Sequence, residues 1–285
     1  MAESADEAKD PIAVSVVVLC RNEAANLPRC LAAVRACRET IVVDDGSDDG
    51  SPAVAAAAGA RVVAHPMASF AAQRNWAMAE AGLRCDWALH LDADEVMTPE
   101  ALAEIRDRLP ALAPGRIGFF ARKVMLDGRW LRRSADYPVF VARLVHRDGP
   151  RFVMRGHGEI VEAPPEAAVY FREPMLHFPF ARGWAEWRER HRRYAAAEAA
   201  RWAAGDSAAG WREIGSADRV RRRRAWRALS SRLPGRPLLR FLYGYIVCAG
   251  FLDGRPGLRF CLAMAWYEAR IDAERRRRAR EMPCT

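Results

Sequence analysis

Short acidic runs follow three apolar stretches of the sequence, and each stretch has the length of a β-strand. Glu23 follows the stretch at 12–19, and Asp44 and Asp45 follow the stretch at 40–43. Asp92, Asp94 and Glu95 follow the stretch at 86–91. Carboxylates that meet at one place repel each other unless a cation lies among them. The spacing of Asp92 and Asp94 suits a hard divalent ion, Mg²⁺ or Mn²⁺, which keeps positions open for phosphate oxygens. We therefore expect Asp92 and Asp94 to hold a metal that bridges the protein to a diphosphate.

The elements that must position these carboxylates alternate along the chain. Each acidic motif alone is also typical of a turn followed by a helix cap, so the information lies in their order on successive strands. Strand-like stretches at 12–19, 40–43, 61–64 and 86–91 alternate with helix-like stretches at 26–36, 51–58, 69–82 and 98–109. This alternation predicts a doubly wound, mostly parallel α/β sheet, in which ligands bind beyond the carboxyl ends of the strands. Arg74 precedes the fourth strand, and we expect it to contact a nucleotide or one of the aspartates.

The second half of the chain has a different pattern of strand-like and helix-like segments. After Pro114, strand-like stretches at 116–125, 139–146, 151–154 and 159–163 are separated by Gly, Pro and Asp, and the chain reads as helical from Arg182 onward. We therefore expect a catalytic domain at residues 1–180 and a basic helical region at residues 181–285. The recurrence of Trp and Tyr at three- and four-residue steps from Trp184 to Trp202 predicts a helical packing face.

Charge is divided unevenly between these two regions. The 285 residues carry a net charge of +9, but residues 1–180 hold 21 Lys and Arg against 25 Asp and Glu, whereas residues 181–285 hold 24 Arg against 11 Asp and Glu. A basic region of this kind favours an anionic partner: phospholipid, a phosphorylated lipid or nucleic acid. Arg221–Arg224 and Arg275–Arg278 flank aromatic helices, as in interfacial membrane helices. We expect residues 220–280 to dock on an anionic membrane surface.

The compartment is predicted from the cysteines and the hydropathy. Seven cysteines without CxxC spacing favour reduced thiols and argue against a zinc site. The acidic N-terminus does not resemble a signal peptide, and no stretch reaches the roughly 18 apolar residues of a spanning helix. We therefore expect a cytoplasmic protein, peripheral on the inner membrane.

Four segments together resemble the family 2 glycosyltransferases, which have a GT-A fold. They are SVVVLCRNEAANLPRCL, IVVDDGSDDGS, AAQRNWAM and LHLDADE, within residues 12–95. The resemblance implies a Rossmann-like, mostly parallel sheet with a helical C-terminal extension. It also implies a UDP-sugar donor whose uracil and ribose contact Glu23 and Asp45, with Asp44 beside them. Asp92 and Asp94 correspond to the family's DxD motif, with Asp94 as the expected direct ligand of Mn²⁺ or Mg²⁺.

The C-terminal region resembles a narrower group, the lipopolysaccharide core glycosyltransferases that add a β-linked glucose to heptose. The similarity lies in LLRFLYGYIVCAGFLDGRPGLRFCLAMAWYEAR and in LHF followed by a helix that bears Trp and Tyr. The QxxRW motif and spanning helices of processive synthases are missing from the sequence, which favours transfer of one sugar. The resemblance implies an inverting, metal-assisted transfer of a hexose, expected to be glucose, to a lipid-linked glycan such as core heptose.

Inverting transfer requires a base that accepts the proton of the attacking hydroxyl, and no covalent nucleophile. The expected base is Glu159, with Glu162 in reserve. Relatives in the narrower group carry adjacent His and Glu after a strand, whereas a glycine separates His157 from Glu159 here. His157 and His177 are expected to be structural or to contact the acceptor rather than a metal.

Three other readings remain open at this point. A related transferase would act on a polyprenyl-phosphate-linked sugar or on a protein. A nucleic-acid-binding protein would use the arginine runs but would leave the acidic motifs without a purpose, so nucleic acid is not an expected partner. A non-catalytic sugar-binding relative would not need intact Asp45, Asp92 and Asp94. The sequence leaves the sugar, the acceptor, the metal and the oligomeric state undetermined.

Overall fold

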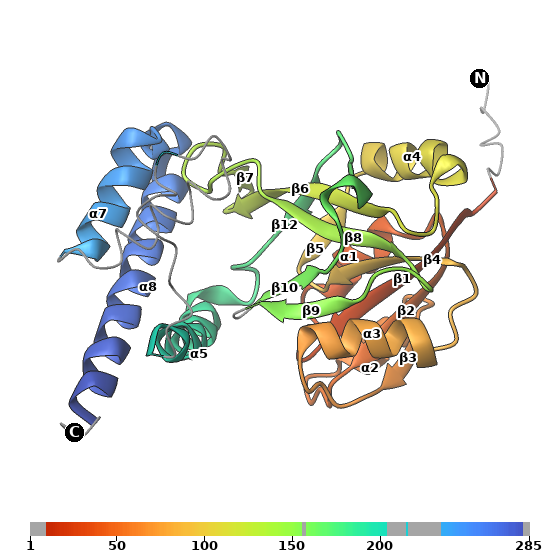
Figure 1. Ribbon diagram of the computed structural model, residues 1–285, viewed down its shortest axis with the longest axis horizontal. Coiled ribbons are helices and arrows are strands. Elements are labelled where there is room, and N and C mark those ends of the chain that lie inside the picture. Colours follow the sequence, from red (N-terminus) through yellow and green to blue (C-terminus); the bar gives the residue numbers. More distant parts are fainter. Residues whose placement is uncertain (1–9, 156–157, 204–214, 216–234, 282–285) are drawn as a thin grey trace. The chain divides into compact units, whose positions relative to one another are not determined.

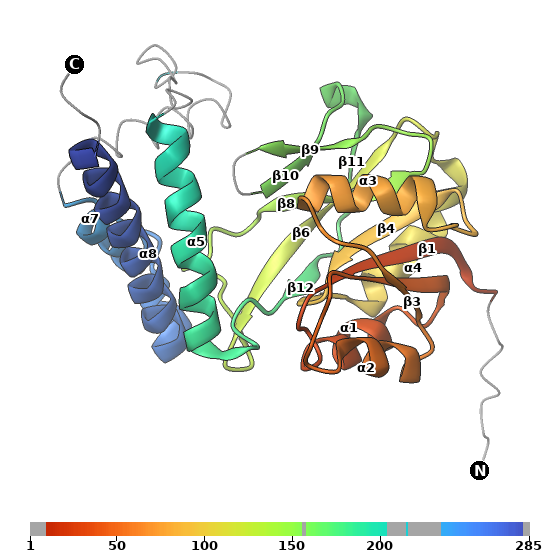
Figure 2. The same cartoon turned by 90° about the horizontal axis from the view of Figure 1, so that it is seen from below.

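A computed structural model of the chain describes residues 10–155, 158–203, 215 and 235–281. The chain divides into two compact units (Figures 1 and 2). The first comprises residues up to 123 together with 138–182, and the second comprises 124–137 together with 183–285. The predicted linker at 205–210 and the arginine run Arg221–Arg224 lie outside the described residues.

The first unit begins with a parallel sheet in the order β3-β2-β1-β4. Its strands are β1 (Ile12–Cys20), β2 (Cys37–Asp44), β3 (Arg61–Ala64) and β4 (Trp87–Asp92). Cys20 of β1 lies opposite Asp44 of β2, and Leu19 lies opposite Asp92 of β4. The parallel register therefore brings the acidic motifs that follow β1, β2 and β4 to the same edge of the sheet, as the sequence predicted.

Antiparallel strands extend this sheet from β4 in the order β8-β6-β12-β5. They are β5 (Glu95–Met97), β6 (Ile117–Leu126), β8 (Phe140–His146) and β12 (Met175–His177), while β7 (Arg129–Trp130) and β11 (Ala168–Tyr170) pair with β6. A separate hairpin consists of β9 (Phe152–Arg155) and β10 (Gly158–Val161). The sequence did not predict β5 or β12, because three residues are too few to show a strand period.

Helices cover both faces of the parallel sheet (Figure 2). In β1, Val16 and Val18 belong to the cluster that includes residues of α1, α2 and α4, whereas Val17 and Leu19 belong to the cluster that includes residues of α3. This alternation is the period of two that a strand buried on both faces requires. The helical elements are α1 (Leu27–Ala33), α2 (Ser51–Ala57), α3 (Phe70–Glu80), α4 (Pro99–Arg108), η1 (Leu109–Ala111) and η2 (Pro165–Ala167).

Side-chain caps begin two of these helices. The hydroxyl of Ser69 accepts the N–H of Ala72 at 3.1 Å to begin α3, and Thr98 accepts the N–H of Ala101 at 3.1 Å to begin α4. Each cap satisfies a backbone donor that a helix start leaves unpaired. The α/β architecture with a helical C-terminal extension is the fold class that the sequence predicted.

The second unit is helical. It contains α5 (Gly183–Ala203), α7 (Arg236–Leu242), the π-helical turn η4 (Tyr243–Val247), η5 (Gly250–Asp253) and α8 (Gly254–Glu281). The predicted packing face on α5 is confirmed, because Trp187 is 2% exposed and His191 lies 3.8 Å from it and 5.1 Å from Tyr267 of α8, measured between ring centroids. Among the described residues, no helix has both the length and the apolar character needed to cross a membrane.

Residues 124–137 group with these helices, whereas the sequence prediction placed them in the first domain. The carboxylate of Asp253 explains the grouping. It accepts the N–H of Arg133 at 2.9 Å, the N–H of Ser134 at 2.8 Å and the hydroxyl of Ser134 at 2.7 Å. Three donors on one buried carboxylate oxygen tie the β7 segment to the start of α8.

Gly118 on β6 provides a test of this packing. A Cβ at Gly118 would lie 2.8 Å from Cβ of Leu144 and 2.9 Å from Cε2 of Phe171. Because this space is filled, we expect Gly118→Ala to lower the free energy of unfolding by about 1–3 kcal/mol in urea titrations. Gly115→Ala is the matched control, since a Cβ there meets nothing within 4 Å. Equal stability of the two variants would contradict the packing.

Candidate active site

The loops after β1 and β2 are joined by hydrogen bonds into one acidic surface. Asp44 accepts the hydroxyl of Ser47 at 2.5 Å and its N–H at 3.0 Å. Ser47 in turn accepts the N–H of Asn22 at 2.9 Å, and Asn22 has the left-handed φ of 56° that a short polar side chain tolerates. Asp44 therefore fixes the loop that follows β1 as well as its own.

Asp45 and Glu23 have cationic partners in these loops. Asp45 accepts Nη1 of Arg21 at 2.9 Å and the N–H of Met67 at 2.8 Å. Glu23 lies 3.2 Å from Nη1 of Arg182, and the same nitrogen donates to the carbonyl of Arg21 at 3.0 Å. The three carboxylates expected at the nucleotide, Glu23, Asp44 and Asp45, thus come together on adjacent loops.

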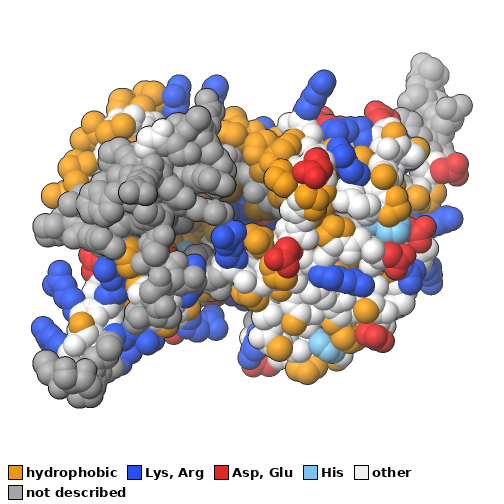
Figure 3. Space-filling model, viewed as in Figure 1, with side chains coloured by type: hydrophobic (Ala, Val, Ile, Leu, Met, Phe, Trp, Pro, Cys, Tyr) orange, Lys and Arg blue, Asp and Glu red, His pale blue; other side chains and the backbone are white. Residues whose placement is uncertain are grey.

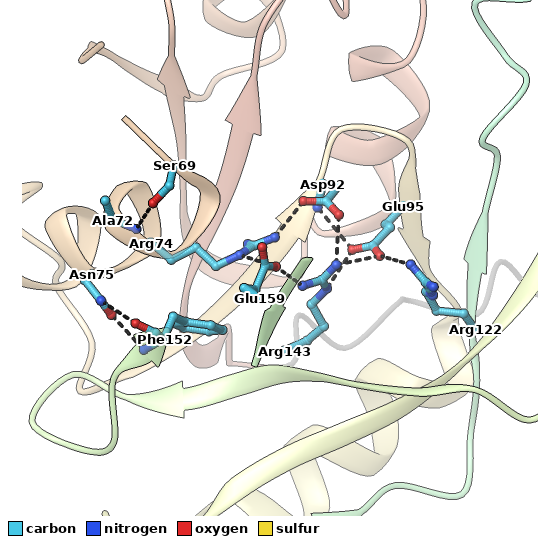
Figure 4. Close-up of polar contacts among 10 residues, drawn as sticks. All are labelled: Ser69, Ala72, Arg74, Asn75, Asp92, Glu95, Arg122, Arg143, Phe152 and Glu159. Atoms are coloured by element: carbon cyan, nitrogen blue, oxygen red, sulfur yellow. Dashed lines mark hydrogen bonds and ion pairs between the residues drawn. The ribbon is translucent and has the colours of Figure 1, made fainter. Parts of the chain in front are cut away.

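A second group of charges lies where β4, β5, β8 and β10 meet α3 (Figure 4). Arg74 of α3 has no exposed surface; its Nε donates to Glu159 at 2.9 Å and its Nη2 to Asp92 at 2.6 Å. Arg143 of β8 is 4% exposed and donates to Asp92 at 2.8 Å and to the same Glu159 oxygen, Oε1, at 3.1 Å. Both oxygens of Asp92 therefore face guanidinium groups.

Glu95 completes this group, which we call the arginine network: Arg74, Arg143, Asp92, Glu95 and Glu159. Glu95 has no exposed surface and accepts Nε and Nη2 of Arg143, each at 2.8 Å. It also accepts the N–H of Asp92 at 3.1 Å and lies 3.9 Å from Arg122. Such pairing is what allows charges to be buried, because an unpaired charge in the interior is strongly unfavourable.

The network sets the protonation states around it. Burial acts to raise the pKa of Asp92, but attraction by Arg143 and Arg74 outweighs it and holds that pKa well below its ordinary value. Burial acts to lower the pKa of Arg143, and the attraction of Glu95 and Asp92 instead raises it well above its ordinary value. For the fully buried His90, burial and then Arg74 lower the pKa well below its ordinary value, so the imidazole is neutral.

Asp94 faces a different partner. Its Oδ2 lies 3.5 Å from Nε2 of His177, the last residue of β12. Backbone pairing fixes this approach, because His177 lies opposite Glu95 and the N–H of Phe178 donates to the carbonyl of Asp94 at 2.8 Å. Nδ1 of His177 is buried and has no hydrogen-bond partner among the described residues. Asp94 and His177 thus present an oxygen and a nitrogen donor side by side.

The expected metal pair, Asp92 and Asp94, is therefore divided by the structure. The described residues contain no group of three or more His, Cys, Asp or Glu side chains that could hold a metal. Asp92 directs both oxygens to arginines, whereas Asp94 meets His177. Two protein ligands are compatible with a divalent ion whose remaining positions belong to phosphate oxygens or water. The donors therefore fit a divalent ion at Asp94 and His177.

Other expected site residues have more definite surroundings than the sequence could give. Of the two alternatives for Arg74, the structure shows the contact with an aspartate, Asp92. Glu159 lies on β10 within the arginine network, Glu162 is exposed just beyond that strand, and His157 lies outside the described residues. Sequence reasoning missed Arg143 and Glu95, and it did not place His177 beside Asp94. A single arginine within the apolar run FVARLVH was a usable indication, since buried charges need partners.

Comparison with known proteins identifies the family. The family model described as Glycosyl transferase family 2 matches residues 15–174, which is more than half of the chain. This chain belongs to glycosyl transferase family 2. The resemblance predicted from the four segments is confirmed, and the match includes the acidic loops after β1 and β2 and the arginine network.

Individual relatives match shorter stretches. The lipopolysaccharide core biosynthesis glycosyltransferase LpsC of Rhizobium meliloti is 29% identical over 151 residues, 51% of this chain and 52% of that protein. The TPR repeat-containing protein Synpcc7942_0270 of Synechococcus elongatus is 47% identical over 98 residues, 34% of this chain and 24% of that protein. The chain thus spans about half or less of the length of these relatives.

Solved structures give a partial match. Glucosyl-3-phosphoglycerate synthase from Mycobacterium tuberculosis, in complex with phosphoglyceric acid, is 20% identical with a TM-score of 0.37. The match covers 50% of this chain and 59% of that protein.

The arginine network predicts an unequal response to two arginine substitutions. Arg143→Met would leave the buried Glu95 without its two guanidinium hydrogen bonds, and we expect it to lower the free energy of unfolding by about 3–5 kcal/mol. Arg122→Met, the control, removes a half-buried arginine 3.9 Å from the same carboxylate, and we expect a loss of about 1 kcal/mol or less. Urea titrations at neutral pH measure both, and comparable losses would contradict the role assigned to Arg143.

Proposed function

We propose that the protein is an inverting glycosyltransferase that transfers a hexose from a UDP-sugar to a lipid-linked glycan, and that this hexose is glucose. The observation that carries the proposal is the convergence of the loops after β1, β2 and β4 at one edge of the sheet, fixed by the register of Cys20 with Asp44 and of Leu19 with Asp92. Membership of glycosyl transferase family 2 supports sugar transfer. The position at the carboxyl ends of parallel strands is where ligands of such sheets bind.

The donor nucleotide is assigned to the loops after β1 and β2. Asp45 and Glu23 would hold uracil and ribose, with Asp44 keeping the loop in shape through its two hydrogen bonds from Ser47. Met67 contributes its N–H to Asp45 and so links the end of β3 to the same surface. These residues bind and orient the donor; they take no part in bond making.

The diphosphate is assigned to the position beside Asp94 and His177. These two residues would hold a divalent ion, which, when bound, supplies Lewis-acid stabilisation of the leaving UDP. An imidazole ligand favours Mn²⁺ over Mg²⁺, because Mg²⁺ prefers oxygen ligands throughout. Asp92 instead holds Arg74 and Arg143 in place, and its two oxygens are assigned to these arginines rather than to the metal.

The general base is assigned to Glu159. Arg74 and Arg143 both bind its Oε1, which fixes the carboxylate while Oε2 is assigned to the acceptor hydroxyl. The attacking oxygen would form its bond to the anomeric carbon as the bond to UDP breaks, and the hydroxyl proton would pass to Oε2. This single displacement inverts the configuration at the anomeric carbon.

The acceptor class is inferred from similarity. LpsC is named as a lipopolysaccharide core biosynthesis glycosyltransferase, and its alignment covers half of this chain. Together with the arginine-rich second unit, this supports a lipid-linked glycan such as core heptose as the acceptor, received at the inner membrane.

Donor binding is tested by calorimetric titration of UDP into the protein with Mn²⁺ present and again with EDTA. We expect binding that requires the metal and that weakens at least about tenfold in Asp94→Asn, because one of two protein ligands loses its charge. Asp48→Asn is the control, since Asp48 is exposed in the same loop system and has no assigned role. Equal affinity in wild type and Asp94→Asn would remove the metal assignment.

The base is tested by turnover of UDP-glucose with a deacylated lipopolysaccharide core acceptor. We expect Glu159→Gln to lower kcat by about 10²–10⁴-fold while UDP affinity is retained, because the amide cannot accept the proton. Glu162→Gln is the control: Glu162 is exposed three residues further along the chain, and this variant is expected to keep wild-type kcat. If Glu159→Gln stays within a few-fold of wild type, Glu159 only anchors the arginines.

A further inference from the structure

Large apolar side chains are exposed together at one end of the helical unit. Figure 3 shows hydrophobic side chains gathered over the α7 end of this unit, at upper left. We call this surface the apolar end; its exposed fractions are Leu238 61%, Leu242 37%, Tyr243 52%, Ile246 57%, Val247 72%, Phe251 50% and Leu252 61%. Isolated exposed apolar residues are ordinary, but a contiguous group from one short segment marks an interaction surface.

The interior of this end is built from small residues, which is why the large ones face outward. Gly244 approaches Cys261 so closely that a Cβ would lie 3.3 Å from its sulfur. A Cβ at Gly250 would meet the carbonyl of Gly244, and one at Gly257 would meet the carbonyl of Gly250. Small residues inside and large apolar residues outside is the pattern of helices that pack within lipid.

Arginines border the apolar end on the side of the β7 segment. Arg129, Arg132, Arg133 and Arg255 are exposed, and the backbone of Arg133 is tied to Asp253, directly after Leu252. Nη1 of Arg129 lies 3.2 Å from the position of a Cβ at Gly254. The backbone of Arg133 and the guanidinium group of Arg129 therefore lie beside the turn that carries the exposed Phe251 and Leu252, and Arg255 follows that turn directly in the sequence.

The acidic groups near this turn are already paired. Asp127 lies 2.5 Å from Arg259, Asp136 lies 3.5 Å from Arg240, and Asp253 is buried with three donors. The border is accordingly positive rather than mixed.

The arginine run Arg275–Arg278, which the sequence analysis assigned to membrane docking, lies elsewhere. On α8, Leu262 is also exposed, by 51%, and the arginine run begins 13 residues beyond it, or about 20 Å along a helix. Its members contact α5 or their own helix: Arg275 lies over Trp202 at 4.5 Å, Arg277 donates to Glu274 at 3.0 Å, and Arg278 donates to the carbonyl of Ala196 at 3.4 Å. Proximity to exposed apolar residues thus favours the β7 arginines instead.

We infer that the apolar end inserts into the interface of an anionic lipid bilayer, with Arg129, Arg132, Arg133 and Arg255 at the level of the lipid phosphates. Apolar side chains would enter the boundary of headgroups and acyl chains, and Tyr243 would keep its hydroxyl in the polar layer. Binding at this surface would bring the protein to the membrane that holds the lipid-linked acceptor. The biological role of the surface therefore rests on the proposed function, whereas its lipid binding can be tested independently.

The test is flotation of the full chain with vesicles of phosphatidylcholine alone and with added phosphatidylglycerol. Wild type should float with the anionic vesicles and much less with the neutral ones. We expect the double variant Arg132→Gln and Arg133→Gln to lose about thirty-fold in partitioning, since each arginine near an anionic surface contributes about fivefold. The double variant Val247→Asn and Leu252→Asn should lose at least about tenfold, because both side chains leave the bilayer.

The matched control is Arg276→Gln with Arg280→Gln, which removes the same charge from exposed positions at the far end of α8. It should float almost as well as wild type. Equal losses in the two arginine pairs, or wild-type flotation of the Val247 and Leu252 variant, would overturn the inference. The inference would also be overturned if wild type formed a dimer and bound no vesicles, and if the Val247 and Leu252 variant were monomeric.

UDP titration of each variant separates this inference from the proposed function. If wild type binds UDP but does not float with anionic vesicles, the membrane inference is wrong and the proposed donor site stands. Flotation without UDP binding would overturn the proposed donor site alone.

Discussion

The burial of two guanidinium groups constrains the site more than any other feature. Arg74 has no exposed surface and Arg143 is 4% exposed, so each requires carboxylates at fixed positions. Asp92, Glu95 and Glu159 meet that requirement from β4, β5 and β10, which come from distant parts of the sequence. The network therefore does more than neutralise charge: it sets where the hairpin of β9 and β10 lies against the end of β4. The direction of the Asp92 carboxylate follows from it, because both of its oxygens face guanidinium groups.

The two aspartates of the DxD motif have different partners in the structure. Asp92 is the last residue of β4 and meets the arginines, whereas Asp94 lies in the turn to β5 and meets His177. The sequence distinguished the two carboxylates only through the family resemblance, which implied Asp94 as the direct ligand. The antiparallel pairing of β5 with β12 distinguishes them by contact, since it brings an imidazole to one aspartate and not to the other.

Much of this could be predicted from local pattern. The apolar runs of β1, β2 and β4, the Ser69 and Thr98 caps and the order of the acidic motifs all follow from short-range chemistry. The contact of Arg74 with Glu159 and the neighbour of Asp94 could not, because they depend on how short strands from distant parts of the sequence come together. The attachment of residues 124–137 to the helical unit was missed for a similar reason, since it rests on one long-range carboxylate, Asp253.

We propose that Asp94 and His177 hold the metal of the donor complex, whereas Asp92 belongs to the arginine network. Electron spin-echo spectroscopy of Mn²⁺ bound with UDP tests it directly, because the echo reports nitrogen nuclei coordinated to the ion. We expect nitrogen modulation in wild type that is lost in His177→Gln and retained in Asp92→Asn. Absence of nitrogen modulation in wild type, or its persistence in His177→Gln, would contradict the account.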